Sequence, residues 1–386
     1  MTFFAIASAC GTGRAQPTLT PVANVAPAAI SEKVSTVLNR ALRDSAFPGA
    51  IAVVGNRRGI LIEQAVGQLD RSDPTPPDSR TLWDMASLTK VVALTSVLMT
   101  LVDEKRLSLD APVQRYIPEF TGKWKNRVTV RHLLTHSGGL AAWRPLYKEA
   151  SSPADALALA IATPLDTLPG VRMVYSDLGA IILGEIARRI TKKPLEHLAA
   201  ERVFTPLGMS ETFYRPDTSL RWRTAPTEID PWRQRHLRAE VHDENAFALG
   251  GVSGHAGLFS TAADLARLAQ AYLNGGELNG RRVWSGKTIS LFTRAQNLEI
   301  SHRALGWETA NGANSGGHYM SPSAFGHTGF TGTSIWIDPE NDVFVILLSN
   351  RVNPTRENRR IASVRTALAD SVMTLLGRPL AAPSVR

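Results

Sequence analysis

A serine and a lysine with the spacing of a nucleophile and its base, Ser87 and Lys90, stand near the start of an apolar stretch over residues 83–102, which is predicted to be a buried helix. On a helix, side chains three residues apart share one face, with Cβ atoms about 5–6 Å apart. Burial would lower the pKa of the ammonium toward neutrality, so that the amine can take the serine proton. N–H groups at the helix N-terminus would stabilise an oxyanion. The pair indicates acyl transfer through a serine, although ordinary amphipathic helices show the same spacing.

Acyl transfer also needs a second proton carrier and a strand edge that holds the acyl chain. Tyr175-Ser176-Asp177 precedes a predicted helix, and His327-Thr328-Gly329 opens a predicted strand, where glycine permits close backbone approach. A competing Tyr272-Leu273-Asn274 ends an amphipathic helix that two glycines follow. Tyr272 is therefore interpreted as a core residue, and Tyr175 as the proton carrier.

Strands at both ends of the chain, with helices between them, must position these motifs. Residues 50–54 and 60–66 predict one hairpin, and residues 331–337 and 343–350 predict another. Ser31 is the expected N-cap of the first helix. Helices are predicted at residues 31–46, 153–162, 179–191, 194–203, 261–273 and 356–376. The expected fold class is α+β: the terminal strands pair in one antiparallel sheet, and a mostly helical insert packs against it to form a cleft.

Composition limits the partners. The chain has 386 residues, is 44% hydrophobic and carries a net charge of +9, which indicates a globular protein that attracts anions such as envelope polymers, acidic lipids or carboxylates. No basic helix or RNA-binding aromatic strand is present in the sequence, so nucleic acid is not an expected partner. His242, Asp243 and Glu244, with His255 and His327, match no metal-binding signature, so no metal or cofactor is predicted.

Residues 1–30 are interpreted as an export signal and a tether. An apolar run ends in small residues at the only cysteine, Cys10. Ala7-Ser8-Ala9 has the pattern of a cleavage site, whereas Ala9-Cys10-Gly11 has that of a lipoprotein junction, which would tether Cys10 to a membrane. The expected location is the periplasm or cell envelope. A cytosolic tail with an incidental cysteine is the alternative.

Two features stay open at this point. Residues 211–240 are rich in arginine, contain Trp222 and Trp232, and fit no predicted element. They form either a solvated excursion or a lip that holds an extended, anionic substrate. His255, within Gly254-His255-Ala256-Gly257, either lines the cleft or is a turn residue.

The three motifs, in this order and spacing, resemble those of the serine β-lactamase and D-Ala-D-Ala peptidase superfamily. The tyrosine of the second motif makes the class C and carboxypeptidase/esterase branch the most similar. Segments 109–113, 130–140 and 257–265 also look like segments of that branch. The resemblance implies a β-lactamase/transpeptidase-like fold for a hydrolase domain over residues 31–380. Its sheet part is expected at about 31–80 and 300–380, and its helical part at about 81–299.

The resemblance also implies roles. Ser87 is the nucleophile, Lys90 and Tyr175 share proton transfer, and the backbone N–H groups of Ser87 and Phe330 hold the oxyanion. No cofactor is implied. The residues expected to bind substrate are Asp177, His255, His327, Thr328, Gly329 and Phe330.

Two positions depart from the pattern. Similar enzymes usually have asparagine where Asp177 stands, and more often lysine where His327 stands. An ionised aspartate cannot donate, and it would repel a substrate carboxylate unless it pairs with Lys90 or His327. An unperturbed histidine is mostly neutral at pH 7, which weakens the attraction of anions. Weak or absent β-lactamase activity is therefore expected.

The function implied by the resemblance is that of an exported serine hydrolase with an acyl-enzyme on Ser87. Its type would be a D-Ala-D-Ala carboxypeptidase or penicillin-binding protein acting on cell-wall peptides, with peptidoglycan as the partner. One alternative is an esterase of the same fold that cleaves small esters. A catalytically silent module that binds wall peptide is the other.

Overall fold

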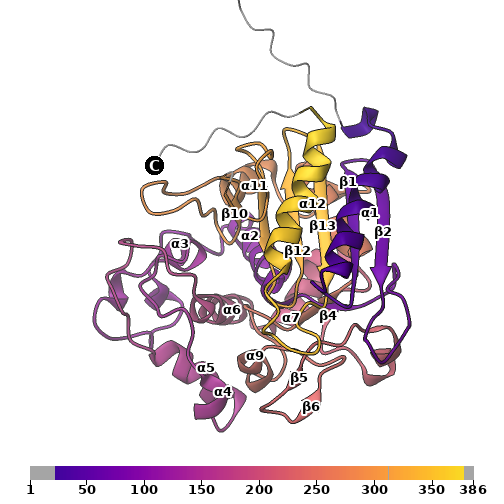
Figure 1. The fold of residues 1–386 in the computed structure, drawn as a ribbon. Coiled ribbons are helices and arrows are strands. Elements are labelled where there is room, and N and C mark those ends of the chain that lie inside the picture. Colours follow the sequence, from indigo (N-terminus) through magenta and orange to yellow (C-terminus); the bar gives the residue numbers. More distant parts are fainter. Residues whose placement is uncertain (1–21, 312, 378–386) are drawn as a thin grey trace, which may run out of the picture.

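A computed structural model describes residues 22–311 and 313–377, and the predicted signal with Cys10 lies outside these residues. Six antiparallel strands form the central sheet in the order β10-β11-β12-β13-β1-β2. In Figure 1 the indigo N-terminal strands lie beside the yellow C-terminal ones, because β1 pairs with β13. The predicted α+β fold, with terminal segments joined in one antiparallel sheet, is confirmed. The strands of this sheet are β1 Gly49–Asn56, β2 Gly59–Gly67, β10 Glu308–Thr309, β11 Phe325–Thr328, β12 Ser334–Asp338 and β13 Val343–Ser349.

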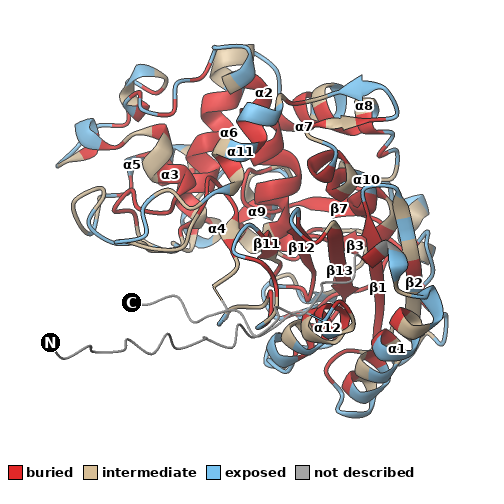
Figure 2. Cartoon of the chain, turned by 90° about the horizontal axis from the view of Figure 1, so that it is seen from above, coloured by how far each residue is buried: buried red, intermediate tan, exposed pale blue. Residues whose placement is uncertain are grey.

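Side chains of β1 alternate between two hydrophobic cores. Ala52 and Val54 face helices α1 (Pro27–Arg43) and α12 (Ile361–Leu375), which pack on each other. Val53 faces the larger core, on the side of α10 (Ala262–Leu273). Figure 2 shows α1 and α12 on one side of the buried strands and α10 on the other. The sheet is thus the middle layer of three.

The first helix differs from its prediction at the N-terminus. Helix α1 begins at Pro27, so Ser31 lies inside the helix and is not its N-cap. Proline suits the first turn, where its missing N–H has no helical acceptor to lose. The predicted helix at residues 153–162 matches α5 at both ends.

In sequence, most of the helices lie between β2 and β10, and most of them are short. Of these, α3, α4 and α5 lie to the left in Figure 1. The α-helices are α2 Ser96–Asp103, α3 Val130–Leu134, α4 Leu146–Glu149, α5 Pro153–Ala162, α6 Asp177–Thr191, α7 Leu195–Ala199, α8 Thr205–Leu207, α9 Glu244–Ala248 and α11 Gly286–Thr293. The 3₁₀ turns are Val22–Asn24, Ala86–Leu88, Val113–Arg115, Lys125–Arg127 and Thr218–Arg223, and the π-helical stretches are Lys90–Thr95 and Ala200–Phe204. The minor strands are β3 Trp83–Asp84, β4 Phe213–Tyr214, β5 Ile229–Asp230, β6 Arg235–His236, β7 Leu258–Ser260, β8 Glu277–Leu278 and β9 Arg281–Arg282.

The reactive stretch is helical only from Ala86 onward. Trp83 and Asp84 form β3, because they pair with Ser260 and Phe259 of β7, so the helix predicted from residue 83 starts too early. A 3₁₀ turn, a π-helical stretch and α2 follow in sequence. Residues 86–103 are long and apolar enough to cross a membrane, but 83% of this stretch is buried inside the fold. It therefore serves as the core helix of the molecule.

Truncation of the central strand should destabilise the fold far more than the same change at its edge. Ile346 of β13 is fully buried in the larger core, so Ile346→Ala should lower the free energy of unfolding by about 2–5 kcal/mol. Ile60, on edge strand β2, is 42% exposed, so Ile60→Ala should stay within about 0.5 kcal/mol. Urea denaturation measures both changes. Equal losses would contradict the assignment of β13 to the core.

Candidate active site

Ser87 is held on a strained turn at the end of β3. The preceding residue, Ala86, has φ 45°, a left-handed conformation that costs roughly 1–2 kcal/mol for a residue with a Cβ. The buried carboxylate of Asp84 accepts the Ala86 N–H at 2.8 Å. The hydroxyls of Thr331 and Thr333 donate to the carbonyls of Asp84 and Met85 at 2.7 and 3.1 Å. The loop after β11 therefore fixes the nucleophile turn against the sheet.

Lys90 lies one turn on and is 2% exposed. Its Nζ lies 2.9 Å from Ser87 Oγ, 3.1 Å from the His255 carbonyl and 2.8 Å from Asp177 Oδ1. An ammonium group has three N–H donors. The contacts with Ser87 and His255 are hydrogen bonds, the contact with Asp177 is an ion pair, and one of the two acceptors is the proposed nucleophile.

The charge on Lys90 differs from the sequence expectation. Burial by itself lowers the pKa of Lys90, but the negative charge of Asp177, with a smaller contribution from Tyr175, outweighs burial, and the net pKa is raised. The expectation of a pKa lowered toward neutrality is therefore wrong. The expectation was based on the apolar run alone, whereas the fold also places the Asp177 carboxylate of α6 beside the amine.

Asp177 gives this site a proton acceptor that asparagine cannot supply. Because the charge of Asp177 raises the pKa of Lys90, an ammonium proton must move uphill to the carboxylate 2.8 Å away before a neutral amine faces Ser87 Oγ at 2.9 Å. That amine can take the hydroxyl proton as Oγ attacks a carbonyl carbon, which restores the ammonium. The net result is a proton moved from Ser87 to Asp177 through Lys90. Of the two pairings considered for Asp177, with Lys90 or with His327, the one with Lys90 is present, and it offsets the repulsion expected of this carboxylate.

Tyr175 stands beside this pair, in the position expected of a second proton carrier. Its ring centroid lies 4.9 Å from Lys90 Nζ, 4.5 Å from the His136 ring and 5.8 Å from the His327 ring. The Tyr175 hydroxyl is buried and makes no well-aligned hydrogen bond within the described part of the chain. The competing Tyr272 donates to Met99 Sδ at 3.2 Å in the core, as interpreted from the sequence.

His136 was not identified from the sequence, although it lies in the 130–140 segment that carries the resemblance. Its Nδ1 accepts the Ser176 N–H at 3.1 Å, which fixes the turn next to Tyr175. Burial, with a smaller contribution from Arg303, lowers the pKa of His136 well below its usual value. His136 is therefore a neutral support for the tyrosine.

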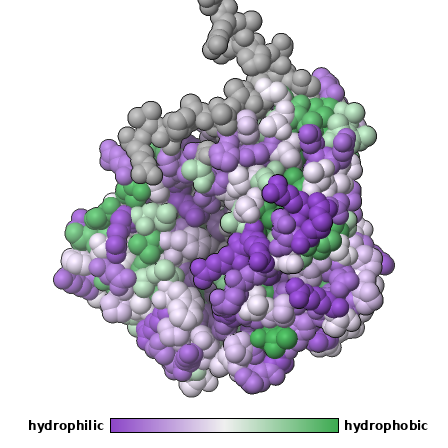
Figure 3. All heavy atoms as spheres, in the orientation of Figure 1, coloured by the Kyte–Doolittle hydropathy of each residue, from purple (hydrophilic) through white to green (hydrophobic). Residues whose placement is uncertain are grey.

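A cavity of about 320 Å³ opens in front of Ser87. The residues that line it are Ser87, Tyr175, Arg303, Glu308, His327, Thr328, Gly329, Phe330, Arg351 and Arg365. The nucleophile, the tyrosine and the third motif thus meet in one place. In Figure 3 hydrophilic side chains surround the hollow near the centre of the face shown.

His327 is a neutral member of this cavity. Its Nδ1 lies 2.8 Å from the Thr328 carbonyl, which can only accept, so Nδ1 carries the proton. Its Nε2 is buried and has no hydrogen-bond partner among the described residues. Burial and then the nearby Arg303 lower the pKa of His327 well below its usual value. His327 therefore offers a lone pair, and not a charge, to a bound molecule.

Arginines, which the sequence analysis did not identify, supply the positive charge. Arg303 and Arg365 line the cavity, and Nη1 of the first and Nε of the second are buried without hydrogen-bond acceptors in the described residues. Burial lowers the pKa of Arg365 to about 9, and Arg351 adds to this effect. Arg351 also packs on the exposed Phe330 ring. Loop and helix positions far from any motif carry these residues, so no local pattern marked them.

Other predicted positions lie outside the cavity. His255 is 1% exposed and stands behind Lys90, which it contacts through its carbonyl. No group of three or more histidine, cysteine or acidic side chains among the described residues is placed to hold a metal. In the 211–240 stretch, arginines such as Arg223 and Arg233 pair with carboxylates of the same stretch. Trp222 and Trp232 are exposed.

Comparison with known proteins agrees with this geometry. Residues 34–369 match the family model described as Beta-lactamase. The chain belongs to the beta-lactamase family. It is a serine hydrolase of the β-lactamase fold, and the resemblance drawn from the three motifs is confirmed.

Its relatives carry two kinds of name. The chain is 33% identical over 346 residues to "Putative D-alanyl-D-alanine carboxypeptidase" of Escherichia coli (strain K12), covering 80% of this chain and 79% of the relative. Among solved structures, a family VIII carboxylesterase aligns with TM-score 0.71 and 26% identity, covering 90% of this chain and 98% of that chain. A penicillin-binding protein homologue from Caulobacter crescentus has TM-score 0.73 at 23% identity and covers 90% and 98%. The last likeness shows the fold.

Tyrosine substitutions test which tyrosine carries protons. Tyr175→Phe removes the hydroxyl beside Lys90 and should lower turnover by roughly two to four orders of magnitude. Tyr272→Phe removes a core hydroxyl that donates to Met99 sulfur, so turnover should change little. Steady-state hydrolysis of a chromogenic ester measures both variants. The reverse order of effects would show that Tyr272 is the functional residue.

Asp177→Asn tests the proton relay through its pH dependence. Loss of the carboxylate removes the charge that raises the pKa of Lys90, so the lysine must become neutral before it can take the serine proton. At about pH 6 the kcat/KM for a neutral ester should fall roughly 100-fold, and it should recover as pH rises through the lowered lysine pKa. The wild type should lack this rise with pH. Superimposable pH profiles would rule out the relay.

Proposed function

We propose that this hydrolase is a D-Ala-D-Ala carboxypeptidase that cleaves peptides with a free C-terminal carboxylate through an acyl-enzyme on Ser87. The observation that carries the proposal is the pair of incompletely bonded guanidinium groups, Arg303 and Arg365, in the cavity of Ser87. A buried cation without an acceptor costs stability unless a ligand supplies one. A terminal carboxylate supplies two oxygens in the geometry that arginine prefers.

The peptide fits the remaining groups of the cavity. The acyl carbonyl would meet Ser87 Oγ and the backbone N–H groups of Ser87 and Phe330. Tyr175 would deliver a proton to the departing amine, and His327 Nε2 would accept one hydrogen bond from the substrate. The carboxypeptidase name of the 33% identical relatives supports this choice. Action on cell-wall peptide requires export, so the envelope location is part of the proposal.

A second candidate is an esterase that acts on small esters. It is favoured by the 26% identity to a family VIII carboxylesterase and by the exposed, apolar Phe330 ring at the cavity. An uncharged ester, however, supplies no carboxylate to Arg303 Nη1 and Arg365 Nε, the two nitrogens that lack acceptors in the described residues. A silent binding module is disfavoured because Ser87 and Lys90 keep a contact of 2.9 Å. β-Lactamase action is expected to be weak, because Asp177 lacks the donor of an asparagine.

Peptides with free and amidated C-termini test the carboxylate requirement. The wild type should release D-alanine from an acyl-D-Ala-D-Ala peptide and should act at least about 30-fold more slowly on its amide, since a lost buried charge partner costs about 2 kcal/mol or more. Ser87→Ala should be inactive on both peptides. Arg303→Gln should reduce the preference for the free acid, whereas the same change at the exposed Arg281 should not. Equal rates on acid and amide would favour the esterase.

A further inference from the structure

We propose that His255, whose ring is hydrogen-bonded to Asp243 and Ser253, is a positioning residue that places Lys90 for proton transfer. The inference rests on the proposed function, in which Lys90 mediates acylation of Ser87. It concerns side chains outside the cavity, and it assigns His255 a role different from the substrate contact expected from the sequence.

The side chain of His255 is locked at both ring nitrogens. Nε2 lies 2.8 Å from Asp243 Oδ1, and Nδ1 lies 2.7 Å from Ser253 Oγ. A carboxylate can only accept, so Nε2 donates to Asp243. Burial raises the pKa of Asp243, but its interaction and hydrogen bond with His255 outweigh burial, and the net pKa is lowered. The ring therefore cannot rotate without losing two buried hydrogen bonds.

Fixing the ring fixes the backbone of the same residue. The His255 carbonyl lies 3.1 Å from Lys90 Nζ, on a loop that otherwise contains glycine at positions 254 and 257. Glycines leave a loop backbone with wide conformational freedom. The hydrogen-bonded imidazole restricts the backbone at the His255 carbonyl, which accepts the hydrogen bond from Lys90.

Helix α9 connects this carbonyl to the second acceptor of Lys90. Asp243 is the N-cap of α9 and accepts the Ala246 N–H at 2.8 Å. Asn245, on the same helix, donates to the Arg144 carbonyl and accepts the Tyr147 N–H. The nearby Ala142 carbonyl accepts the Asp177 N–H at 2.9 Å. The His255 side chain is thus bonded to the N-cap of α9, and Asp177 is bonded to the 142–147 segment that Asn245 of the same helix contacts.

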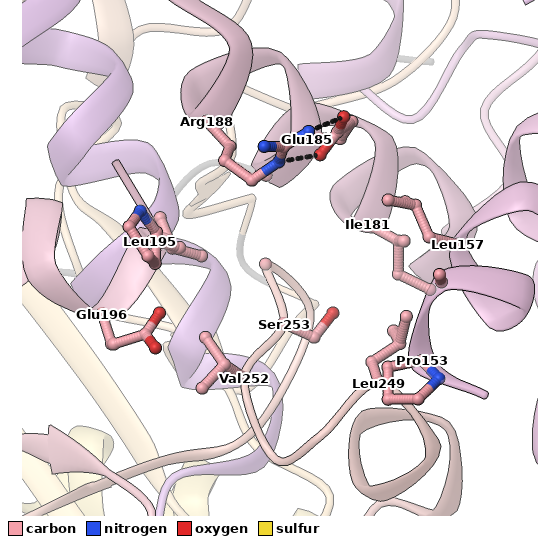
Figure 4. Close-up of a pocket in the computed structure, with 14 residues that line it drawn as sticks. Pro153, Leu157, Ile181, Glu185, Arg188, Leu195, Glu196, Leu249, Val252 and Ser253 are labelled. Carbon is pink, nitrogen blue, oxygen red and sulfur yellow. Dashed lines mark hydrogen bonds and ion pairs between the residues drawn. The ribbon is translucent and has the colours of Figure 1, made fainter. Parts of the chain in front are cut away.

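Asp243, Ser253 and His255 do not line the substrate cavity. Ser253 lines a separate cavity of about 300 Å³ between α5, α6 and α7, shown in Figure 4. Ser253, His255 and Asp243 also have the order of a nucleophile, base and acid. Ser253 is 6% exposed, however, and its carbonyl is held by the Tyr214 hydroxyl at 3.2 Å. This geometry favours support of Lys90 over a second reaction centre.

The test compares substitutions of two histidines that each pair with an aspartate. His255→Ala should lower the rate constant for acylation of Ser87 by a fluorophosphonate probe about 10- to 100-fold, the range for misplacement of a catalytic group by up to about 1 Å. With a neutral ester, kcat should fall while KM stays close to that of the wild type. The matched control is His318→Ala, which breaks the exposed pair with Asp370 and should leave both constants unchanged.

A milder variant keeps the test valid if His255→Ala does not fold, as judged by circular dichroism. Ser253→Ala removes only the partner of Nδ1, and it should slow acylation about 3- to 10-fold. Wild-type acylation by either folded variant, or a rise in KM with unchanged kcat, would overturn the positioning role. Labelling of Ser87→Ala that disappears in the Ser87→Ala, Ser253→Ala double variant would also overturn it, because Ser253 would then be a nucleophile.

The outcomes separate this inference from the proposed function. Labelling of wild type but not of Ser87→Ala supports the acyl-enzyme whatever the His255 variants do. If acylation is then insensitive to His255, the positioning role alone fails. If the wild type is neither labelled nor active on peptides and esters, both proposals fail.

Discussion

The ion pair between Lys90 and Asp177 is the interaction on which the rest of the site depends. Lys90 is almost fully buried, and a charge in such a place is tolerated only with a partner and further hydrogen bonds. The pair joins the core helix to the first residue of α6, and two positions before Asp177 stands Tyr175. One contact of 2.8 Å therefore brings together the base, its acceptor and the second proton carrier.

Around Ser87 the arginines are positively charged and the histidines are neutral. His136 and His327 are neutral because they are buried near Arg303, so they contribute shape and hydrogen bonding. The arginines keep the positive charge, since guanidinium holds its proton even when burial lowers its pKa. Attraction of anions should therefore persist across the range in which an ordinary histidine titrates. A substrate carboxylate would complete the hydrogen bonding that the protein leaves open at Arg303 and Arg365.

The sequence predicted what depends on neighbouring residues or on an ordered set of motifs. Two β-rich runs joined by a turn located β1 and β2, and the helix predicted at residues 153–162 is α5. The motifs brought Ser87, Lys90, Tyr175 and His327 to one site. Contacts between distant segments could not be predicted from the sequence. Pairing with β7 makes Trp83 and Asp84 a strand. The Asp177 carboxylate on α6 reverses the expected direction of the Lys90 pKa shift. Arg303 and Arg365 belong to no local pattern, because only the folded chain places them beside Ser87.

The charge state of Lys90 shows directly whether Asp177 controls the protonation of this lysine. In protein labelled with ¹⁵N at lysine Nζ, the Lys90 resonance is assigned by its absence in Lys90→Arg, and its shift is followed against pH by NMR. The account predicts that Lys90 remains an ammonium through about pH 10.4, where unperturbed lysines titrate, because Asp177 raises its pKa. Titration of Lys90 near neutral pH would contradict the conclusion that Asp177 keeps this lysine charged, since the lysine would then act as a neutral base without help from Asp177.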